Sequence, residues 1–179
     1  LGGVNWQKRK ALLKNRLKLA AEALLKIAAA RAIKNGTRIA PEQETYDEFV
    51  ARFPYTETDD QLQSIEDVLA DLRSGRPMDR LICGDVGFGK TEVAMRAAFA
   101  AVTAPEKAQV AIIAPTTLLA RQHYNNFTAR FRGFPIRIKP LSRLVSAKEA
   151  SLTRKATAEG EVDSVIGTHA LLSKDVKFK

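Results

Sequence analysis

Apolar residues in the first forty positions recur at the period of an α-helix. They are separated by alternating steps of four and three, which places them in one stripe along the helix. The pattern predicts a long amphipathic helix over residues 6–35, ended by Gly36. Such a stripe packs on its own domain or on a neighbour, or forms a coiled coil, which its two heptads support only weakly. The stripe consists of Leu13, Leu17, Ala20, Leu24 and Ile27.

Beyond residue 40 the pattern changes to short apolar runs that alternate with helical periods. Two helices come first, at 44–52 and 59–73, followed by four predicted strands with a helix after each of the first three. This alternation is typical of an α/β domain, in which helices cover both faces of a parallel sheet. Thr58 with Gln61, and Ser146 with Glu149, have the spacing of capping boxes. The predicted strands are 80–83, 109–114, 136–141 and 162–166, and the intervening helices are 90–102, 118–131 and 146–158.

The turn between the first predicted strand and its helix carries a complete phosphate-loop motif, G-x-x-x-x-G-K-[ST]. Its glycines allow backbone N–H groups to converge on phosphate oxygens at a helix start. Lys90 would neutralise the outer phosphates, and the Thr91 hydroxyl would bind Mg²⁺. The motif by itself predicts binding of a nucleoside triphosphate with Mg²⁺. The loop consists of Gly84, Asp85, Val86, Gly87, Phe88, Gly89, Lys90 and Thr91.

Charge is distributed unevenly along the 179 residues, whose formal net charge is +9. Residues 1–40 carry ten Lys/Arg and one acid, and residues 121–155 carry nine and one, whereas residues 41–120 hold seven bases and fourteen acids. The two basic segments indicate either surfaces for a phosphate backbone or simply solvated faces.

Composition and hydropathy exclude several classes of protein. No apolar run reaches the ~18 residues that a membrane span requires, and the basic amino-terminal segment lacks the apolar core of a secretory signal. We therefore expect a cytoplasmic protein without membrane partners. The single cysteine, Cys83, allows no intrachain disulfide, and its apolar neighbours predict a buried position.

Residues 80–96 resemble motif I of the superfamily-two helicases and translocases. The segment Arg80-Leu-Ile-Cys-Gly-Asp-Val-Gly-Phe-Gly-Lys-Thr-Glu-Val-Ala-Met-Arg96 is most similar to the family of bacterial transcription-repair coupling factors. The related RecG helicases usually have Ser where this chain has Phe88. The resemblance implies that the nucleotide is ATP and that Lys90 and Thr91 are the catalytic residues. It also implies a RecA-like fold and an enzyme, an ATP-dependent translocase on double-stranded DNA. That enzyme displaces stalled RNA polymerase and recruits excision-repair proteins.

Other segments resemble further motifs of this superfamily. Residues 53–61, Phe-Pro-Tyr-Thr-Glu-Thr-Asp-Asp-Gln, are similar to its adenine-recognition motif, which implies that Gln61 contacts the base; alternatively, Gln61 only caps its helix. Three segments that follow predicted strands resemble motifs Ia, Ib and Ic, which hold DNA phosphates. The implied nucleic-acid contacts are Pro115, Thr116, Thr117, Arg121, Gln122, Ser142, Arg143, Gly167, Thr168 and His169.

The resemblance also divides the chain. Residues 1–40 resemble the segment that joins a polymerase-binding module to the motor, beginning with Leu1-Gly-Gly-Val-Asn-Trp6. Residues 41–179 resemble the first part of the first RecA-like domain, truncated before the acidic motif II and the second lobe with its arginine fingers. We therefore expect an incomplete RecA-like P-loop domain that hydrolyses ATP negligibly by itself.

Two other interpretations stay open. A RecG-like helicase for branched DNA would share the phosphate loop, although Phe88 and residues 1–6 favour the coupling factors. A non-catalytic interaction module, with a basic helix that binds a partner and a vestigial loop, belongs to a different class. The intact Lys90 and Thr91 speak against it.

Overall fold

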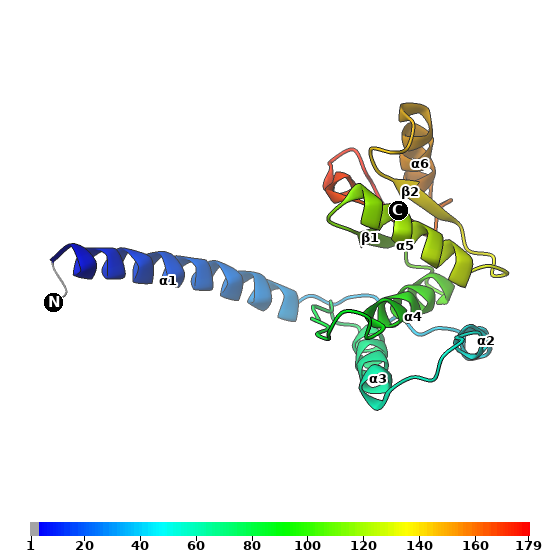
Figure 1. Ribbon diagram of the computed structural model, residues 1–179, viewed down its shortest axis with the longest axis horizontal. Coiled ribbons are helices and arrows are strands. Elements are labelled where there is room, and N and C mark those ends of the chain that lie inside the picture. The colour runs from blue at the N-terminus through cyan, green and yellow to red at the C-terminus, as the bar shows by residue number, and fades with distance from the viewer. Residues whose placement is uncertain (1–3) are drawn as a thin grey trace.

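A long helix projects from the rest of the molecule in the computed structural model, which describes residues 4–179 (Figure 1). Helix α1 runs over Val4–Ala32, which confirms the predicted helix but ends it three residues earlier. Residues 1–3, part of the segment that resembles a connector, lie outside the described residues.

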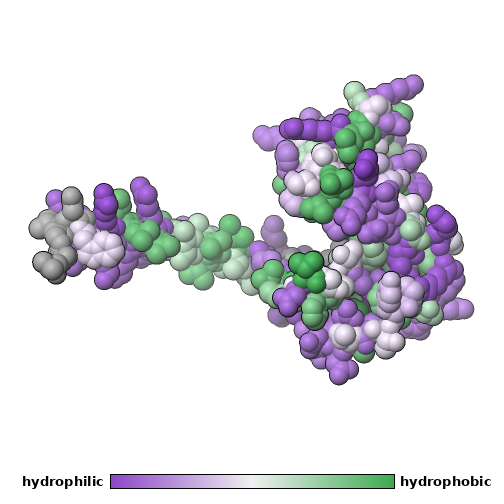
Figure 2. Space-filling model, viewed as in Figure 1, coloured by the Kyte–Doolittle hydropathy of each residue, from purple (hydrophilic) through white to green (hydrophobic). Residues whose placement is uncertain are grey.

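The apolar residues of α1 are exposed, and the helix is less one-sided than its sequence pattern predicts. Leu17 and Leu24 of the stripe are 62% and 67% exposed, so the stripe does not pack on the described part of this domain. Figure 2 shows this apolar surface along the middle of the helix. Apolar residues off the stripe weaken its amphipathic character, which is the main departure from the prediction. They are Leu12, Leu19 and Leu25.

The linker after α1 is attached to the domain through backbone hydrogen bonds. Gly36 donates its N–H to the carbonyl of Gly75 at 2.7 Å, and Ile39 donates to that of Leu72 at 2.9 Å. Arg31, in the last turn of α1, forms an ion pair with Asp79. These contacts anchor the carboxyl end of α1 to the turn that precedes the phosphate loop.

Three helices and a group of aromatic side chains form the larger core. Helices α2 (Gln43–Ala51), α3 (Asp59–Arg73) and α4 (Lys90–Thr103) confirm the predicted helices within one residue. Phe49 and Phe99 are fully buried and stack with their ring centroids 4.0 Å apart. Phe131 and Phe134 approach Phe99 edge-on, so side chains from distant segments share one cluster. Both predicted capping boxes are present, at Thr58 and Ser146.

A parallel three-stranded sheet supports the second half of the chain. Strands β1 (Val110–Ile113), β2 (Ile138–Leu141) and β3 (Ser164–Gly167) lie in the order β1-β3-β2. Helices α5 (Thr117–Arg130) and α6 (Ala147–Glu159) and the 3-10 turn η1 (His169–Leu172) complete the fold. Because Ile166 enters the aromatic core and Val165 a second core with Leu171, both faces of β3 are covered. The predicted α/β class with helices on both faces is confirmed.

One predicted strand does not form. Residues 80–83 have no strand partner among residues 4–179, and Leu81 is 84% exposed. A parallel strand is stable only when a neighbour takes up its backbone hydrogen bonds, and no described strand lies beside this segment. Cys83 is consequently exposed rather than buried as predicted. None of the helices in the described part of the chain is long and apolar enough to cross a membrane.

Candidate nucleotide and DNA sites

The phosphate-loop residues form a turn directly before α4. Gly87 and Gly89 have φ angles of 88° and 72°, a region of backbone conformation that residues other than glycine rarely adopt. The positive φ favours glycine at position 89, and a Cβ added there would lie 2.4 Å from the side-chain amide nitrogen of Gln61, which would have to move aside. Lys90 folds back over the turn, and its Nζ donates to the carbonyls of Gly84 at 2.7 Å and Asp85 at 2.6 Å. The ammonium group is therefore held directly above the loop.

The starts of α2 and α4 have no side-chain cap, unlike those of α3, α5 and α6, and of the two only α4 follows the glycines of the phosphate loop. Those three helices are capped by the side-chain oxygens of Thr58, Thr116 and Ser146. Helix α4 begins after Gly89, and no side chain accepts a hydrogen bond from its first N–H groups. Uncapped N–H groups at a helix start, together with the helix dipole, favour an anion. The loop thus fits a phosphate group, whose oxygens would also satisfy the Lys90 ammonium.

Gln61 connects the capping box of α3 to the phosphate loop. Its Oε1 accepts from the Thr58 N–H at 3.0 Å, and its own N–H donates to the Thr58 hydroxyl. Its Nε2 donates to the carbonyl of Phe88 at 2.9 Å. The side chain therefore does more than cap its helix, and it still has one donor and one acceptor site in reserve.

A hollow of about 930 Å³ opens beside the loop. Aromatic residues of the segment before α3, Phe53 and Tyr55, line it together with Gln61, Gly89 and Thr91. Tyr55 is 74% exposed, and its ring lies 5.5 Å from that of Phe53. A smaller hollow of about 250 Å³ is also lined by Gln61 and is bordered by Lys90. A flat base and the phosphates of a nucleotide can thus be accommodated around one amide.

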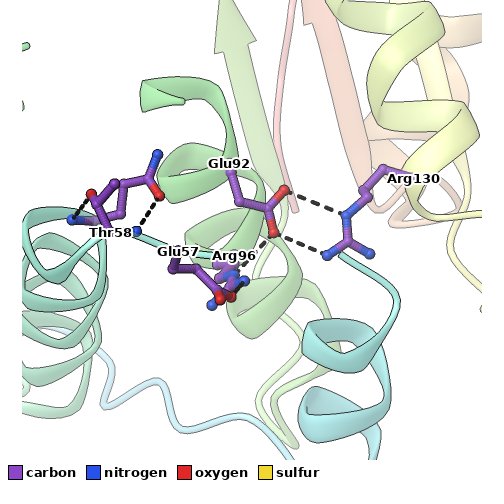
Figure 3. Close-up of polar contacts among 6 residues, drawn as sticks. Glu57, Thr58, Glu92, Arg96 and Arg130 are labelled. Carbon is purple, nitrogen blue, oxygen red and sulfur yellow. Dashed lines mark hydrogen bonds and ion pairs between the residues drawn. The ribbon is translucent and has the colours of Figure 1, made fainter. Parts of the chain in front are cut away.

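A buried cluster of ion pairs forms around the first turns of α4, directly after the loop (Figure 3). Glu92 follows Thr91 in α4, and its Oε1 accepts from Arg96 Nε and from Arg130 Nη2, both at 2.9 Å. Arg96 also pairs with Glu57, four residues before Gln61. Burial opposes the charge of Arg96, yet its hydrogen bonds to Glu57 and Glu92 raise its pKa. The cluster joins the adenine-motif segment, the loop helix and α5.

Glu57 makes part of the stability of this region dependent on pH. The Arg96 guanidinium holds the pKa of Glu57 below its ordinary value of 4.5. A carboxylate with a lowered pKa stabilises the fold above its unfolded pKa and loses that contribution as the pH falls through the folded pKa. We expect Glu57→Gln to lower the melting temperature at neutral pH, and the difference from wild type to shrink below pH 4.5. Thermal unfolding in parallel buffers measures this, and a difference that stays constant with pH would contradict it.

The segments that resemble DNA-contacting motifs meet at one edge of the sheet. Ile113 and Leu141, the last residues of β1 and β2, both pair with Gly167 of β3, so the carboxyl ends of the strands are aligned. Pro115, Thr116, Arg121, Gln122, Arg143 and His169 are exposed at or near this edge, and Thr117 and Ser142 are half-buried. Thr116 caps α5 through a hydrogen bond from the Leu119 N–H.

Two of the predicted contacts are placed differently. Thr168 is only 3% exposed, so its side chain does not face solvent, and its carbonyl accepts from Leu171. Gly167 is buried between strands, where an added Cβ would lie 2.1 Å from the Leu141 carbonyl oxygen. Its lack of a side chain serves close strand packing, so a role for these two residues at a DNA surface does not fit their burial.

Sequence reasoning missed the cluster around Glu92. The i, i+4 spacing of Glu92 and Arg96 in a helix signals their pairing. The sequence gives no indication that Glu57 and Arg130 complete the cluster, because they are 39 and 38 residues away from their partners. Their meeting depends on how α4 and α5 pack.

Comparison with known proteins places this arrangement in a family. The transcription-repair-coupling factor of Rickettsia prowazekii is 51% identical over 99% of this chain, and that of Escherichia coli is 50% identical over 100% of it. The chain spans only 16% and 15% of the lengths of these two relatives. A solved structure of RecG bound to a three-way DNA junction has a TM-score of 0.80 and 35% identity, covering 88% of this chain and 21% of RecG.

A second structure, of a hypothetical ATP-dependent RNA helicase from Sulfolobus tokodaii, has a TM-score of 0.56 and 17% identity, which supports the fold alone. It covers 76% of this chain and 38% of the helicase chain. The family model of the DEAD/DEAH box helicases matches residues 58–179, which include the capping box, the phosphate loop and the whole sheet. From this match over most of its length, the chain belongs to the DEAD/DEAH box helicase family.

Proposed function

We propose that this chain is the ATP-binding part of a double-stranded DNA translocase that displaces stalled RNA polymerase and couples transcription to nucleotide-excision repair. The observation that carries the proposal is the uncapped start of α4 under the Lys90 ammonium, a site shaped for phosphate. The name and roughly 50% identity of the matched relatives support the biological role. RNA polymerase and repair proteins would bind parts of the intact protein outside this chain.

The nucleotide would bind with its phosphates at the loop and its base in the neighbouring hollow. Lys90 would exchange its two carbonyl partners for phosphate oxygens, and the Thr91 hydroxyl would face Mg²⁺. The bound metal would neutralise phosphate charge during hydrolysis. The remaining donor and acceptor sites of Gln61 suit the edge of adenine, and Tyr55 and Phe53 offer aromatic surface for its face.

Removal of the Gln61 amide should reduce discrimination between bases. We expect Gln61→Ala to weaken Mg·ATP binding roughly fivefold while changing GTP binding little, because one good hydrogen bond is worth about 1 kcal/mol. Competition binding with the two nucleotides measures this ratio. Thr58→Ala, which removes the cap of α3 but keeps the amide, serves as the control. Equal losses for ATP and GTP would show that Gln61 acts only on the loop.

Double-stranded DNA would lie along the carboxyl edge of the sheet and be held by its backbone. Thr116, Arg121 and Arg143 present hydroxyl and guanidinium groups there, which suit phosphates rather than base edges. Affinity should therefore fall with rising salt and vary little with sequence. Closing of two lobes around ATP would move this edge relative to a second grip on the DNA.

A RecG-like helicase for branched DNA remains the second candidate, favoured by the similarity of the two folds. The higher identity to the coupling factors favours the first. The two differ in substrate. A protein that releases a stalled polymerase from linear DNA in the presence of ATP is a coupling factor. One whose hydrolysis requires a three-way junction is RecG-like.

The 179-residue chain by itself should bind Mg·ATP weakly and hydrolyse it negligibly. Phosphoryl transfer needs a positioned metal and charge stabilisation around the transferred group as well as the phosphate loop. The resemblance assigns the acidic motif and the arginine fingers to segments other than residues 1–179. A phosphate-release assay with DNA tests this, and release at the rate of a complete motor would contradict it.

A further inference from the structure

The ion-pair cluster around Glu92 connects the phosphate loop to the far end of the helix that begins at the DNA edge. Glu92 lies in the first turn of α4, directly after Thr91. Arg130 is the last residue of α5, and the first residue of that helix is Thr117, next to the exposed Thr116. At 1.5 Å per residue, the 14 residues of α5 form a rod of about 20 Å between the two places.

The cluster is buried and balanced in charge. The side chains of Arg96, Glu92 and Arg130 are 3%, 8% and 11% exposed, and that of Glu57 is 20% exposed. The cluster therefore contains two acidic and two basic side chains. Water and salt therefore screen these interactions weakly. Loss of one partner would leave another charge buried without compensation.

Arg130 depends on Glu92 for its orientation. Its Nη2 and Nε donate to the two carboxylate oxygens of Glu92 at 2.9 and 3.4 Å. Its guanidinium carbon lies 3.9 Å from the centre of the Phe49 ring, and its Nη1 is buried without a hydrogen-bond partner. A shift of α5 must therefore either pull Glu92 along or break this two-point contact.

We propose that Glu92 and Arg130 are positioning residues that couple DNA bound at the amino end of α5 to the phosphate loop. The inference rests on the proposed function. DNA phosphates that contact Thr116 displace α5. Arg130 transmits this displacement to Glu92, and Glu92 shifts the turn that holds Lys90 and Thr91. DNA stimulation of ATP hydrolysis then depends on this ion pair, whereas nucleotide binding alone does not.

The test uses the full-length protein that contains this chain and measures steady-state ATP hydrolysis with and without linear double-stranded DNA. Arg130→Met and Glu92→Gln should each reduce the stimulation by DNA roughly tenfold, within the usual range of coupling between two sites. The KM for ATP and the rate without DNA should change much less. The double variant should lose no more than either single one, since both substitutions remove the same link.

Two further variants keep the test decisive. Arg130→Lys retains the charge with a single donor group, folds more readily and should lose only part of the stimulation. Arg132→Met removes an exposed arginine just beyond α5 and should leave the stimulation intact. Stimulation that persists in Arg130→Met and Glu92→Gln would overturn the inference. A parallel fall of both rates, stimulated and unstimulated, would also overturn it, because it would indicate a structural role only.

The outcomes for the wild-type protein separate this inference from the proposed function. Absence of Mg·ATP binding would refute the proposed function and the inference together. Binding and hydrolysis of ATP without any effect of DNA would overturn the inference and also count against a DNA translocase. DNA-stimulated hydrolysis that survives loss of the ion pair would leave the motor assignment standing and remove Glu92 and Arg130 from its coupling path.

Discussion

Replacement of Lys90 by alanine in the full-length protein should abolish DNA-stimulated ATP hydrolysis, with a loss of at least roughly 100-fold in kcat. The ammonium group lies above the loop and is held by the carbonyls of Gly84 and Asp85 at 2.7 and 2.6 Å. Phosphate oxygens would replace these carbonyls, so the substitution would remove one of the positive charges that neutralise the phosphates during phosphoryl transfer. A coupled phosphate-release assay measures the rate.

Lys155→Ala provides the matched control, because it removes an exposed lysine of α6 that pairs only with Glu159 four residues later. It should leave hydrolysis unchanged. Lys90→Ala protein that binds Mg·ATP and DNA as the wild type does would instead support the non-catalytic interaction module with a vestigial loop. Melting curves of both variants show whether the fold has been retained.

Truncation of Phe99 to alanine should cause the largest loss of stability of any single substitution in the described domain, about 3–5 kcal/mol. The ring is fully buried and contacts aromatic residues from α2 and from the end of α5 and the turn beyond it. The cavity would separate α4 from both segments, so the loss should also spread to the phosphate loop.

Urea-dependent hydrogen exchange measures this loss in the intact protein when it is followed on peptides from α2 and α5. The midpoint of exchange for both helices should shift together to lower urea. Leu172→Ala, at a residue that is 73% exposed, should shift neither. A shift confined to α4 would mean that the aromatic cluster does not join the three helices into one cooperative unit.

Local chemistry explains why so many elements could be predicted. The capping boxes at Thr58 and Ser146 fix two helix starts through contacts within three residues, and both form as predicted. The glycines at 87 and 89 and the helix start at Lys90 follow from conformational preferences of single residues. The alternation of apolar runs and helical periods suffices for the α/β class and the parallel sheet.

Exposure and long-range partners did not follow from the sequence. The apolar run 80–83 is typical of a buried strand, but a strand also requires a neighbour, and none of the described strands supplies one. The stripe of α1 indicates burial, yet the helix projects away from the domain. Thr168 follows a strand at the carboxyl edge of the sheet, and only the packing of η1 decides that it is buried.

The sequence by itself therefore determined the phosphate loop, the capped starts of α3 and α6 and the α/β class, since each depends on residues close together in the chain. Only the tertiary structure decided that Glu57 pairs with Arg96 and that Arg130 pairs with Glu92. Buried charges that lie dozens of residues apart in the sequence can pair only after α4 and α5 have packed. The spacing of residues along the chain does not predict that packing.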